Sequence, residues 1–484
     1  MINYSSSELN VFDKKSLNIF LFNKKNLNEP EEVLTKFELE ADKEILGEMI
    51  SDDGEAVLFP VKSGGNSSTL LFFSVDQSKQ NELRNTASKL IKSVRGKKFE
   101  NIYLNVFPAL KNPSVSTFRE LLEGMMLGEY KFDKYKSSKD EEKPKKLNLV
   151  SSFDLENVIS ETTLLFNGVN LSRDLSNEPA NVLTPETFAS EVKNNLENEY
   201  TSVEVFDEKM LEEKNFGLIL AVGNASANPP RLIKIHYKPE NAIKKIVLVG
   251  KGVTYDSGGL SIKTTPGMFE MKADMAGAGS VAGAIYAASK NKLPYEIIGL
   301  LPAVENMLAG NSYKPGDVLT GYKGKTVEIG DTDAEGRLIL ADALEYANEF
   351  KPDYIIDLAT LTGAAFISLG FLYSAMFTDN ELLADTFDSA GKSTYELVWQ
   401  QPLTKEYKSL LDTKMADIAN LGPRHSGAIT AALFLQHFVD EKIPWMHLDI
   451  AGPSIKNDIL DYNKNYNTGY GVRLIYKALK SGKL

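Results

Sequence analysis

Two short stretches of the sequence hold the residues whose types and spacing could do chemistry. The first runs from Lys251 and Asp256 to Lys263 and Asp274, and the second is the segment 331–337, Asp-Thr-Asp-Ala-Glu-Gly-Arg. The chain has no cysteine and only 4 histidines, so thiolate ligands and the usual pairs of nucleophile and base are largely missing. Chemistry at these stretches must therefore rest on carboxylates, lysines and an arginine.

Four carboxylates in the two stretches could hold a pair of divalent cations: Asp256, Asp274, Asp333 and Glu335. Two such ions, about 3.5 to 4 Å apart, can polarise a carbonyl and lower the pKa of a water enough to supply hydroxide near neutral pH. The four negative charges match the four positive charges of two ions, and hard oxygen ligands suit Mn²⁺ or Mg²⁺ as well as Zn²⁺. The pattern predicts a two-metal hydrolytic site.

The cationic side chains of the two stretches are expected to differ in role. Removing the proton of a lysine at pH 7 costs roughly 4 to 5 kcal/mol, whereas metal binding at a well-formed site is worth on the order of 10 kcal/mol. Lys251, which follows a glycine that permits close approach, is therefore acceptable as a neutral metal ligand. Lys263 and Arg337 should stay charged, which favours a bound anion and the oxyanion that develops during acyl transfer.

The chain is long enough, at 484 residues, to need more than one hydrophobic core. Short apolar runs alternate with helix-like segments over residues 1–150, which predicts a small N-terminal α/β domain. We interpret the dense charge run at 130–146 as the interdomain boundary or an exposed loop. Residues 154–175 are predicted to form a helix that connects to a larger C-terminal α/β catalytic domain, 151–484.

The C-terminal region predicts a doubly wound domain with a central mixed sheet flanked by helices. Strand-like apolar runs occur at 218–222, 232–236, 246–249, 297–301, 354–358 and 445–450, and helical segments at 277–289 and 338–349. Ligands of such sheets bind beyond the carboxyl ends of the strands. Since Lys251 comes just after the run 246–249, we expect it at that edge of the sheet.

The composition excludes several classes of protein. The formal net charge is −12, from 54 Lys and Arg against 66 Asp and Glu, which disfavours a nonspecific nucleic-acid binder. No stretch approaches the roughly 20 consecutive apolar residues needed to cross a bilayer, and the first ten residues lack the pattern of a secretory signal. We therefore expect a cytoplasmic enzyme with neither a membrane nor a nucleic acid as partner.

Three motifs carry a resemblance to a known family. The runs Gly-Lys-Gly-Val-Thr-Tyr-Asp-Ser-Gly-Gly at 250–259, Met-Lys-Ala-Asp-Met at 271–275 and Thr-Asp-Ala-Glu-Gly-Arg-Leu at 332–338 resemble the signature of the leucine aminopeptidases, the cytosol aminopeptidase family of dinuclear metallopeptidases. Similarity also extends through the segments 177–185, 357–364 and 445–452. The resemblance covers roughly residues 150 to 484, and the first 150 residues match only in general character.

The resemblance implies an enzyme that releases N-terminal amino acids, leucine and other apolar residues among them, from peptides with a free N-terminus. It implies two divalent metal ions per subunit, Mn²⁺ or Zn²⁺, one of which would accept the free α-amine. By the family's pattern the metals would be held by Lys251, Asp256, Asp274, Asp333 and Glu335.

The same resemblance implies roles for residues that do not bind metal. Lys263 would polarise the scissile carbonyl, and Arg337 would hold a bicarbonate ion that acts as general base. The pocket for the first side chain of the substrate would be lined by Met271, Thr360, Gly363 and Ala451. Family members are homohexamers, two trimers stacked face to face with the active sites facing an interior cavity.

Other interpretations of these residues stay open at this point. The spacing from Asp331 to Asp342 imitates an EF-hand calcium loop, although the preceding residues 326–329 look like a strand and the last ligand should be glutamate. Asp274 could cap a helix that begins at Met275. The family usually has asparagine where this chain has Asp331, and the added negative charge could shift metal preference. The four histidines are interpreted as structural.

Two other functions are weighed against the peptidase. One is a structural or DNA-binding role of a hexamer, which the acidic composition disfavours and a salt-dependent gel shift would test. The other is a two-metal phosphatase or amidase built on the same ligands, which a comparison of aminoacyl amides with phosphate esters would separate.

Overall fold

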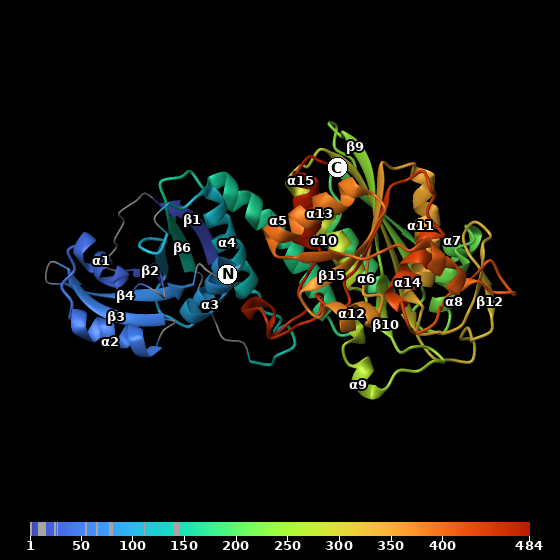
Figure 1. Cartoon of the computed structure of the whole chain (residues 1–484), viewed down its shortest axis with the longest axis horizontal. Helices are drawn as coiled ribbons and strands as arrows, with labels where there is room; N and C mark the ends of the chain where they lie inside the picture. Colours follow the sequence, from blue (N-terminus) through green and yellow to red (C-terminus); the bar gives the residue numbers. More distant parts are fainter. Residues whose placement is uncertain are drawn as a thin grey trace. The chain divides into compact units, whose positions relative to one another are not determined.

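The computed structural model describes residues 2–7, 16–23, 26, 28–53, 56–63, 66–76, 81–110, 112–138 and 145–484. Two compact units make up the chain (Figure 1). The first comprises Met1–Phe166 and Leu460–Lys464, and the second Asn167–Ile459 and Asn465–Leu484. The division falls inside helix α5, Glu156–Asn177, which lies close to the helix predicted at 154–175. The domain boundary near residue 150 stays a prediction.

The first unit is built on a six-stranded sheet in the order β1-β6-β5-β2-β4-β3. Only β3 runs antiparallel to its neighbour. The strands of this sheet are β1 (Ile2–Ser7), β2 (Leu17–Asn23), β3 (Ala56–Ser63), β4 (Asn66–Val75), β5 (Asn101–Asn105) and β6 (Lys145–Val150). The helices of the unit before α5 are α1 (Glu29–Lys36), α2 (Lys43–Asp53), α3 (Glu82–Arg95) and α4 (Val115–Glu129).

The sequence of β2 shows why this sheet is mostly parallel. Residues 17–22 are all buried and, apart from Asn18, apolar, which is typical of a parallel strand covered on both faces. β6 pairs with β1 and β5, so the charge run predicted at 130–146 ends inside a strand of the first unit. Its described residues 130–138 form neither helix nor strand, and residues 139–144 lie outside the described part of the chain.

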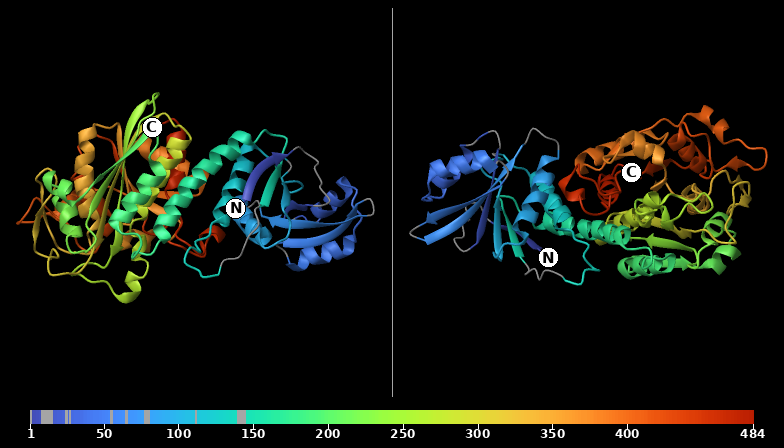
Figure 2. Two further views of the ribbon diagram at one scale, coloured as in Figure 1. Left: turned by 180° about the vertical axis from the view of Figure 1, so that it is seen from behind. Right: turned by 90° about the horizontal axis from the view of Figure 1, so that it is seen from below.

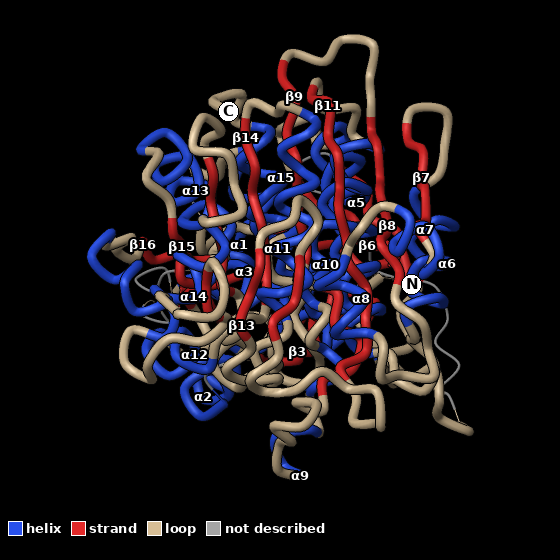
Figure 3. The backbone as a smooth tube through the Cα atoms, turned by 90° about the vertical axis from the view of Figure 1, so that its right-hand side faces the viewer, coloured by secondary structure: helices blue, strands red, loops and turns tan. Residues whose placement is uncertain are grey.

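The second unit contains a nine-stranded mixed sheet in the order β16-β15-β18-β14-β9-β11-β8-β7, with β10 beside β11. Figure 3 shows these strands side by side. They are β7 (Thr201–Phe206), β8 (Arg231–Tyr237), β9 (Lys244–Gly250), β10 (Gly252–Asp256), β11 (Tyr295–Asn306), β14 (Tyr354–Ala359), β15 (Tyr373–Phe377), β16 (Leu397–Gln400) and β18 (Trp445–Asp449). A small separate sheet joins β12 (Val318–Thr320), β13 (Thr326–Glu328) and β17 (Ile418–Ala419).

Helices cover both faces of the large sheet (Figures 1 and 2). One layer contains α6 (Pro185–Leu196), α10 (Ala276–Lys290), α13 (Glu381–Thr394) and α15 (Val472–Lys480), and the other α8 (Gly217–Gly223), α11 (Gly336–Ala347) and α14 (Gly427–Gln436). Shorter helices are α7 (Glu208–Glu213), α9 (Thr265–Met268) and α12 (Gly363–Leu369). The predicted α/β fold with a central mixed sheet is confirmed.

One predicted strand is wrong: residues 218–222 form helix α8. Leu218, Ile219 and Val222 are completely buried. A short helix that is apolar on every side carries no helical periodicity, so its sequence cannot be distinguished from that of a buried strand.

Close packing of α10 on the sheet depends on small residues. A Cβ atom at Gly277 would lie 2.2 Å from the carbonyl oxygen of Leu358 in β14, a distance that no side chain tolerates. The absence of a side chain therefore lets the first turn of α10 contact the end of β14 directly. This contact fixes the backbone just after Asp274, next to the strand end that leads to Thr360.

Asp342 is a buried acceptor that ties three segments of the second unit together. Its Oδ2 accepts hydrogen bonds from the backbone N–H groups of Leu218, 2.9 Å, and Ile219, 3.0 Å, and its Oδ1 accepts one from Tyr322, 2.8 Å. With β13 in place of the helix that must precede an EF-hand loop, these bonds account for Asp342 and argue against the calcium-loop interpretation.

Asp342→Asn should lower the stability of the second unit, because one acceptor oxygen becomes an NH₂ group facing a backbone donor. We expect a loss of about 2 kcal/mol, seen at pH 8 as a thermal midpoint lower by roughly 4 °C or more. Asp385→Asn on the exposed face of α13 is the control and should change stability by less than about 0.5 kcal/mol. Equal midpoints for the two variants would contradict this role.

Candidate active site

The candidate site lies at the carboxyl edge of three neighbouring parallel strands, β18, β14 and β9. Lys251 directly follows β9, Thr360 directly follows β14, and Ala451 lies two residues beyond β18. Connections between the strands bring the remaining candidate residues to the same edge. This is where a doubly wound sheet places its ligands.

Lys251 is the centre of one cluster. Its side chain is buried, with only 3% of the residue exposed, and its Nζ lies 2.7 Å from Oδ2 of Asp274 and 2.9 Å from Oε1 of Glu335. Nζ also donates a hydrogen bond of 2.9 Å to the carbonyl oxygen of Thr360. The amine is thus held among oxygen atoms from three different segments.

Lys263 is the centre of a second cluster. Its Nζ lies 2.9 Å from Oδ2 of Asp256 and 2.5 Å from Oδ1 of Asp333. Oδ1 of Asp256 accepts hydrogen bonds of 2.8 Å from the backbone N–H of Gly258 and from Nδ2 of Asn306. These bonds fix one oxygen of Asp256 and leave the other directed at the lysine.

The two clusters meet through three carboxylates. Asp256, Asp333 and Glu335 each offer one oxygen atom, and these three atoms lie within 4.8 Å of one another. Asp256 and Glu335 are buried, whereas Asp333 is exposed. Carboxylates at this separation repel one another, so a cation between them would stabilise the arrangement.

The electrostatics of the cluster fit bound cations. Burial raises the pKa values of Asp274 and Glu335, the charge of Asp256 raises them further, and Lys251 opposes the shift. Oε2 of Glu335, in a residue that is 1% exposed, has no hydrogen-bond partner among the described residues. A buried carboxylate oxygen without a donor is costly, and a hard divalent cation is the kind of group that would satisfy it.

The protonation states of Lys251 and Lys263 depend on the same charges. Burial by itself would lower the pKa of Lys251, but Asp274, Glu335 and Asp256 raise it more. Burial also opposes the charge of Lys263, and Asp256 and Asp333 outweigh it, so its pKa is raised. Both amines are therefore charged when the carboxylates have no other cation.

Arg337 lies in the first turn of α11 and is buried. Its Nη1 donates a hydrogen bond of 2.6 Å to the carbonyl oxygen of Asn420, and its Nε has no partner among the described residues. Burial lowers the pKa of Arg337 to about 10, while Glu335 and Asp449 raise it. The guanidinium stays charged at neutral pH and has a donor available for an anion.

The four residues expected to line the substrate pocket lie around the same strand ends. Met271 begins the short 3₁₀ helix η1, Met271–Ala273, directly before Asp274. Thr360 donates a 2.7 Å hydrogen bond from Oγ1 to Oδ1 of Asp274. Gly363 begins α12 and is exposed, and Ala451 is half-buried. Among these four described residues, only Thr360 makes a side-chain hydrogen bond to a metal-ligand candidate, and the pocket roles of all four stay a prediction.

The side chain of Asp274 does not cap α10. The N-cap of α10 is Met275, and no side chain caps this helix. The carboxylate of Asp274 instead contacts Lys251 and Thr360. The site interpretation of Asp274 is therefore favoured over the capping one.

Two asparagines of the site, Asn306 and Asn420, were not predicted from the sequence. Asn306 at the end of β11 donates to Asp256 and, at 3.0 Å, to the carbonyl oxygen of Thr332. Oδ1 of Asn420 accepts a 2.7 Å hydrogen bond from the N–H of Gly330. Both hold the loops that carry the carboxylates, yet neither belongs to a motif. Only the pairing of β10 with β11 brings Asn306 near.

Gly336 keeps the amine of Lys251 in place. A Cβ atom at this position would lie 2.4 Å from Cε and 2.7 Å from Nζ of Lys251. Gly336→Ala should therefore displace the amine and lower kcat/KM by about 100-fold, or roughly 2.7 kcal/mol, with a small change in stability because the obstructed group is a side-chain end. Gly310→Ala, with open space around its Cβ, is the control. A normal rate in Gly336→Ala would show that the position of Nζ is unimportant.

Comparison with known proteins places these residues in a family. The catalytic-domain model of the cytosol aminopeptidase family matches residues 170–476, and the model of the family's N-terminal domain matches residues 47–139. The chain belongs to the cytosol aminopeptidase family. The resemblance carried by the three motifs is confirmed, and the N-terminal match extends it into the region where the motifs gave only general character.

Individual relatives agree with the family match. A probable cytosol aminopeptidase of Clostridium perfringens is 42% identical over 406 residues, 82% of each chain, and one of Persephonella marina is 40% identical over 434 residues, 87% of each chain. A mutant of tomato leucine aminopeptidase superimposes with a TM-score of 0.86 at 29% identity, covering 99% of this chain and 96% of its own. The bottromycin maturation enzyme BotP in complex with Mn gives a TM-score of 0.85 at 30% identity, covering 97% and 100%.

This cytosol aminopeptidase family member is a metal-dependent aminopeptidase, a hydrolase that removes N-terminal residues from peptides. The predicted function and enzyme class are confirmed, and the phosphatase alternative loses its support. In the described part of the chain, no helix combines the length and the apolar character that crossing a membrane requires.

Proposed function

We propose that Asp256, Asp274, Asp333 and Glu335, together with Lys251 as a neutral amine, hold two divalent metal ions per subunit. The observation that supports this most is the convergence of these five side chains at one edge of the sheet, with buried carboxylates close together. When bound, the two ions supply Lewis acidity that polarises a carbonyl and lowers the pKa of a water. Loading them requires the loss of one proton from Lys251, whose pKa the carboxylates now raise.

Lys263 is the residue that stabilises the transition state in this proposal. Its ammonium group lies 2.9 Å from Oδ2 of Asp256 and 2.5 Å from Oδ1 of Asp333, directly beside two of the proposed metal ligands. A fixed positive charge favours the oxyanion that forms as the peptide carbonyl is attacked. A charged Lys263 fits this role because the two carboxylates raise its pKa.

Arg337 would hold the bicarbonate ion that supplies the general base. The four carboxylates of the motifs are assigned to metal, so none remains to accept a proton from water. The guanidinium is anchored through Nη1 on Asn420 and leaves Nε to donate to an anion. An anchored, charged guanidinium suits a planar carboxylate-like ligand.

Arg337→Ala should fold and bind metal but hydrolyse peptides roughly 100-fold more slowly, the contribution expected from one general base. Rates of the wild type in carbonate-free buffer should rise when bicarbonate is added, and the variant should not respond. Arg119→Ala, which removes a half-buried ion pair with Glu161 in the first unit, is the control and should respond like the wild type. A variant that keeps the full response would remove Arg337 from this role.

Substrate preference, metal identity and assembly complete the proposal. Leucine and other apolar residues would occupy a pocket lined by Met271, Thr360, Gly363 and Ala451. The metals would be manganese or zinc, in line with the manganese named for BotP. We also propose that the protein is a homohexamer in the cytoplasm, a proposal supported by the family resemblance. That nucleic acid is not a partner stays a prediction from the net charge.

A panel of aminoacyl substrates would test this proposal as a whole. The enzyme is stripped with a chelator and reloaded with Mn²⁺, Zn²⁺ or Co²⁺ before each assay. We expect activity to disappear on chelation, to return at two ions per chain, and to be highest for apolar first residues. Full activity after complete removal of metal would end the proposal, and a preference for charged first residues would remove the pocket assignment alone.

A further inference from the structure

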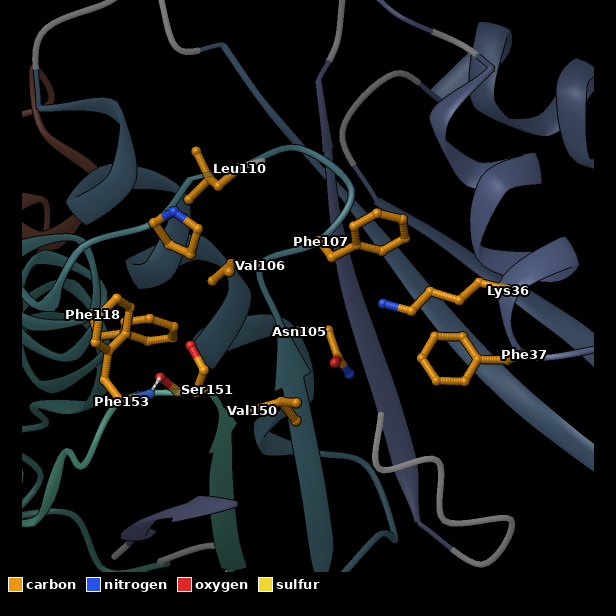
Figure 4. A pocket seen from close by; sticks show the side chains of 12 residues that line it. Lys36, Phe37, Asn105, Val106, Phe107, Leu110, Phe118, Val150, Ser151 and Phe153 are labelled. Carbon is orange, nitrogen blue, oxygen red and sulfur yellow. Dashed lines mark hydrogen bonds between the residues drawn. The ribbon is translucent and has the colours of Figure 1, made fainter. Parts of the chain in front are cut away.

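A cavity of about 210 Å³ lies in the first unit, at the carboxyl ends of β5 and β6 (Figure 4). Lys36 and Phe37 at the end of α1 form one side, Phe118 and Phe153 the other, and Asn105 lies between them. All of the lining residues belong to the first unit, whereas the proposed metal ligands belong to the second. The function proposed for the second unit assigns this cavity no role.

The topology of the first sheet makes this edge a place for a ligand. β2 and β5 are adjacent and parallel. From β2 the chain continues through α1 and α2 to β3 and β4 on one side, whereas from β5 it continues through α4 to β6 on the other side. Connections that leave neighbouring strands in opposite directions open a crevice at the strand ends, and ligands of open α/β sheets bind in such crevices.

An unsatisfied polar group faces this crevice. Asn105 is only 5% exposed, and its Nδ2 has no hydrogen-bond partner among the described residues. Buried amide groups are nearly always hydrogen-bonded, so this donor indicates a missing acceptor. Figure 4 shows its side chain between Val150 on one side and Lys36 and Phe37 on the other.

The cavity also carries a positive charge without a counter-charge in its wall. Lys36 is the one ionisable residue among the lining residues, and its Nζ lies 4.3 Å from the ring centroid of Phe107 and 5.6 Å from that of Phe37. Pro113, which also lines the cavity, is followed closely by the first turn of α4, where a helix favours negative charge. The polar groups therefore select an anion.

The walls and the size of the cavity restrict further which ligands could bind. Phe37 packs on buried Phe20 with ring centroids 5.4 Å apart, and Phe118 packs edge-on against Phe153 at 6.2 Å. Aromatic walls held in this way suit a planar ring. A volume of about 210 Å³ is smaller than the 300–1,000 Å³ of common ligand pockets, so one ring and one anionic group fill it, and a dinucleotide does not fit.

We propose that the first unit holds a second small-molecule site, separate from the aminopeptidase residues, for an anion that carries one aromatic ring. The anionic group, a carboxylate or a phosphate, accepts from Nδ2 of Asn105 and pairs with Nζ of Lys36. The ring lies against the phenylalanine side chains.

Ligand-observed saturation-transfer NMR on the full-length, metal-loaded enzyme tests this site. The probes are 3-phenylpropanoate and benzyl phosphate, each paired with its neutral counterpart, 3-phenylpropanamide and benzyl alcohol. Affinities are compared in the wild type, Lys36→Met, Asn105→Leu and the control Lys98→Met, which changes an exposed lysine of the same unit outside the cavity. Asn105→Leu keeps the size of the side chain and removes the donor.

We expect at least one anion to bind with Kd on the order of 1 mM or tighter, and its neutral counterpart about tenfold more weakly. Lys36→Met and Asn105→Leu should each weaken the anion about tenfold, while Lys98→Met leaves it unchanged. The stronger of the two anions identifies the site as one for carboxylate or for phosphate. Equal binding by all four proteins, or no binding of either anion at about 10 mM, would overturn the proposal.

Discussion

Replacing Glu335 with glutamine should reduce kcat/KM by at least about 1,000-fold, which corresponds to roughly 4 kcal/mol of transition-state stabilisation. The substitution keeps the shape of the side chain and removes its charge. Glu335 is one of three carboxylates whose oxygens meet within 4.8 Å, and its Oε1 lies 2.9 Å from Nζ of Lys251. A neutral amide offers a much weaker oxygen to a divalent cation, so the metal content should fall below two ions per chain.

The fold should survive this substitution. Burial and the charge of Asp256 already raise the pKa of Glu335, so the folded protein tolerates an uncharged group at this position. Thermal unfolding of metal-free wild type and metal-free variant should therefore be similar. This comparison separates loss of the site from loss of the fold.

Asp331→Asn is the matched control for Glu335→Gln. Oδ1 of Asp331 accepts a 2.9 Å hydrogen bond from the N–H of Asp333, and asparagine keeps that acceptor. Because this residue is not among the proposed metal ligands, the control should retain two ions per chain and a rate within about threefold of wild type. Elemental analysis and peptide hydrolysis measure both quantities. If Glu335→Gln matched the control in both, the residue would not be a metal ligand.

Lys263→Met should lower kcat by 100- to 1,000-fold, the loss expected when one charged group is removed from an oxyanion site. The substitution keeps the apolar stem and removes the ammonium group. Since Lys263 is not a proposed ligand, the metal content should stay at two ions per chain. KM should change little, because the interaction is made with the charge that develops in the transition state and not with the bound peptide.

The control for Lys263 is Lys314→Met, which removes an exposed ammonium that pairs with Asp317 at 3.2 Å. Exposed pairs of this kind contribute little, so its kinetics should equal those of the wild type. A rise in KM with an unchanged kcat for Lys263→Met would assign the lysine to substrate binding and contradict its role in catalysis.

Much of the second unit could be predicted from its sequence because the signals are local. β9 contains the apolar run 246–249 and β14 is apolar apart from Asp357, which fits strands that are buried on both faces. Thr184 and Pro185 predict the start of α6, and the structure shows Thr184 as its N-cap. Helix α8 could not be predicted in the same way, because a segment that is apolar on every side lacks the periodicity that distinguishes a helix from a strand.

Only the site residues that belong to sequence motifs could be predicted. The motifs name the carboxylates and both lysines, and the structure brings these residues together. The fixing of Asp256 by Asn306, 50 residues away in sequence, depends on the register of β10 against β11, which no local pattern encodes. The cavity of the first unit could not be predicted for the same reason, because Lys36 in α1, Asn105 at the end of β5 and Phe153 after β6 are far apart in the sequence.

Crystals of the enzyme grown with excess Mn²⁺, measured at the manganese absorption edge, test the central claim most directly. The account predicts two anomalous peaks per chain, about 3.5 to 4 Å apart as in other two-metal sites, enclosed by the side chains of Lys251, Asp256, Asp274, Asp333 and Glu335. The amine of Lys251 would then coordinate a metal ion, no longer an ammonium paired with carboxylates. Fully active enzyme whose crystals show no peak at these residues, or a single peak with Lys251 still paired to Asp274, would contradict it.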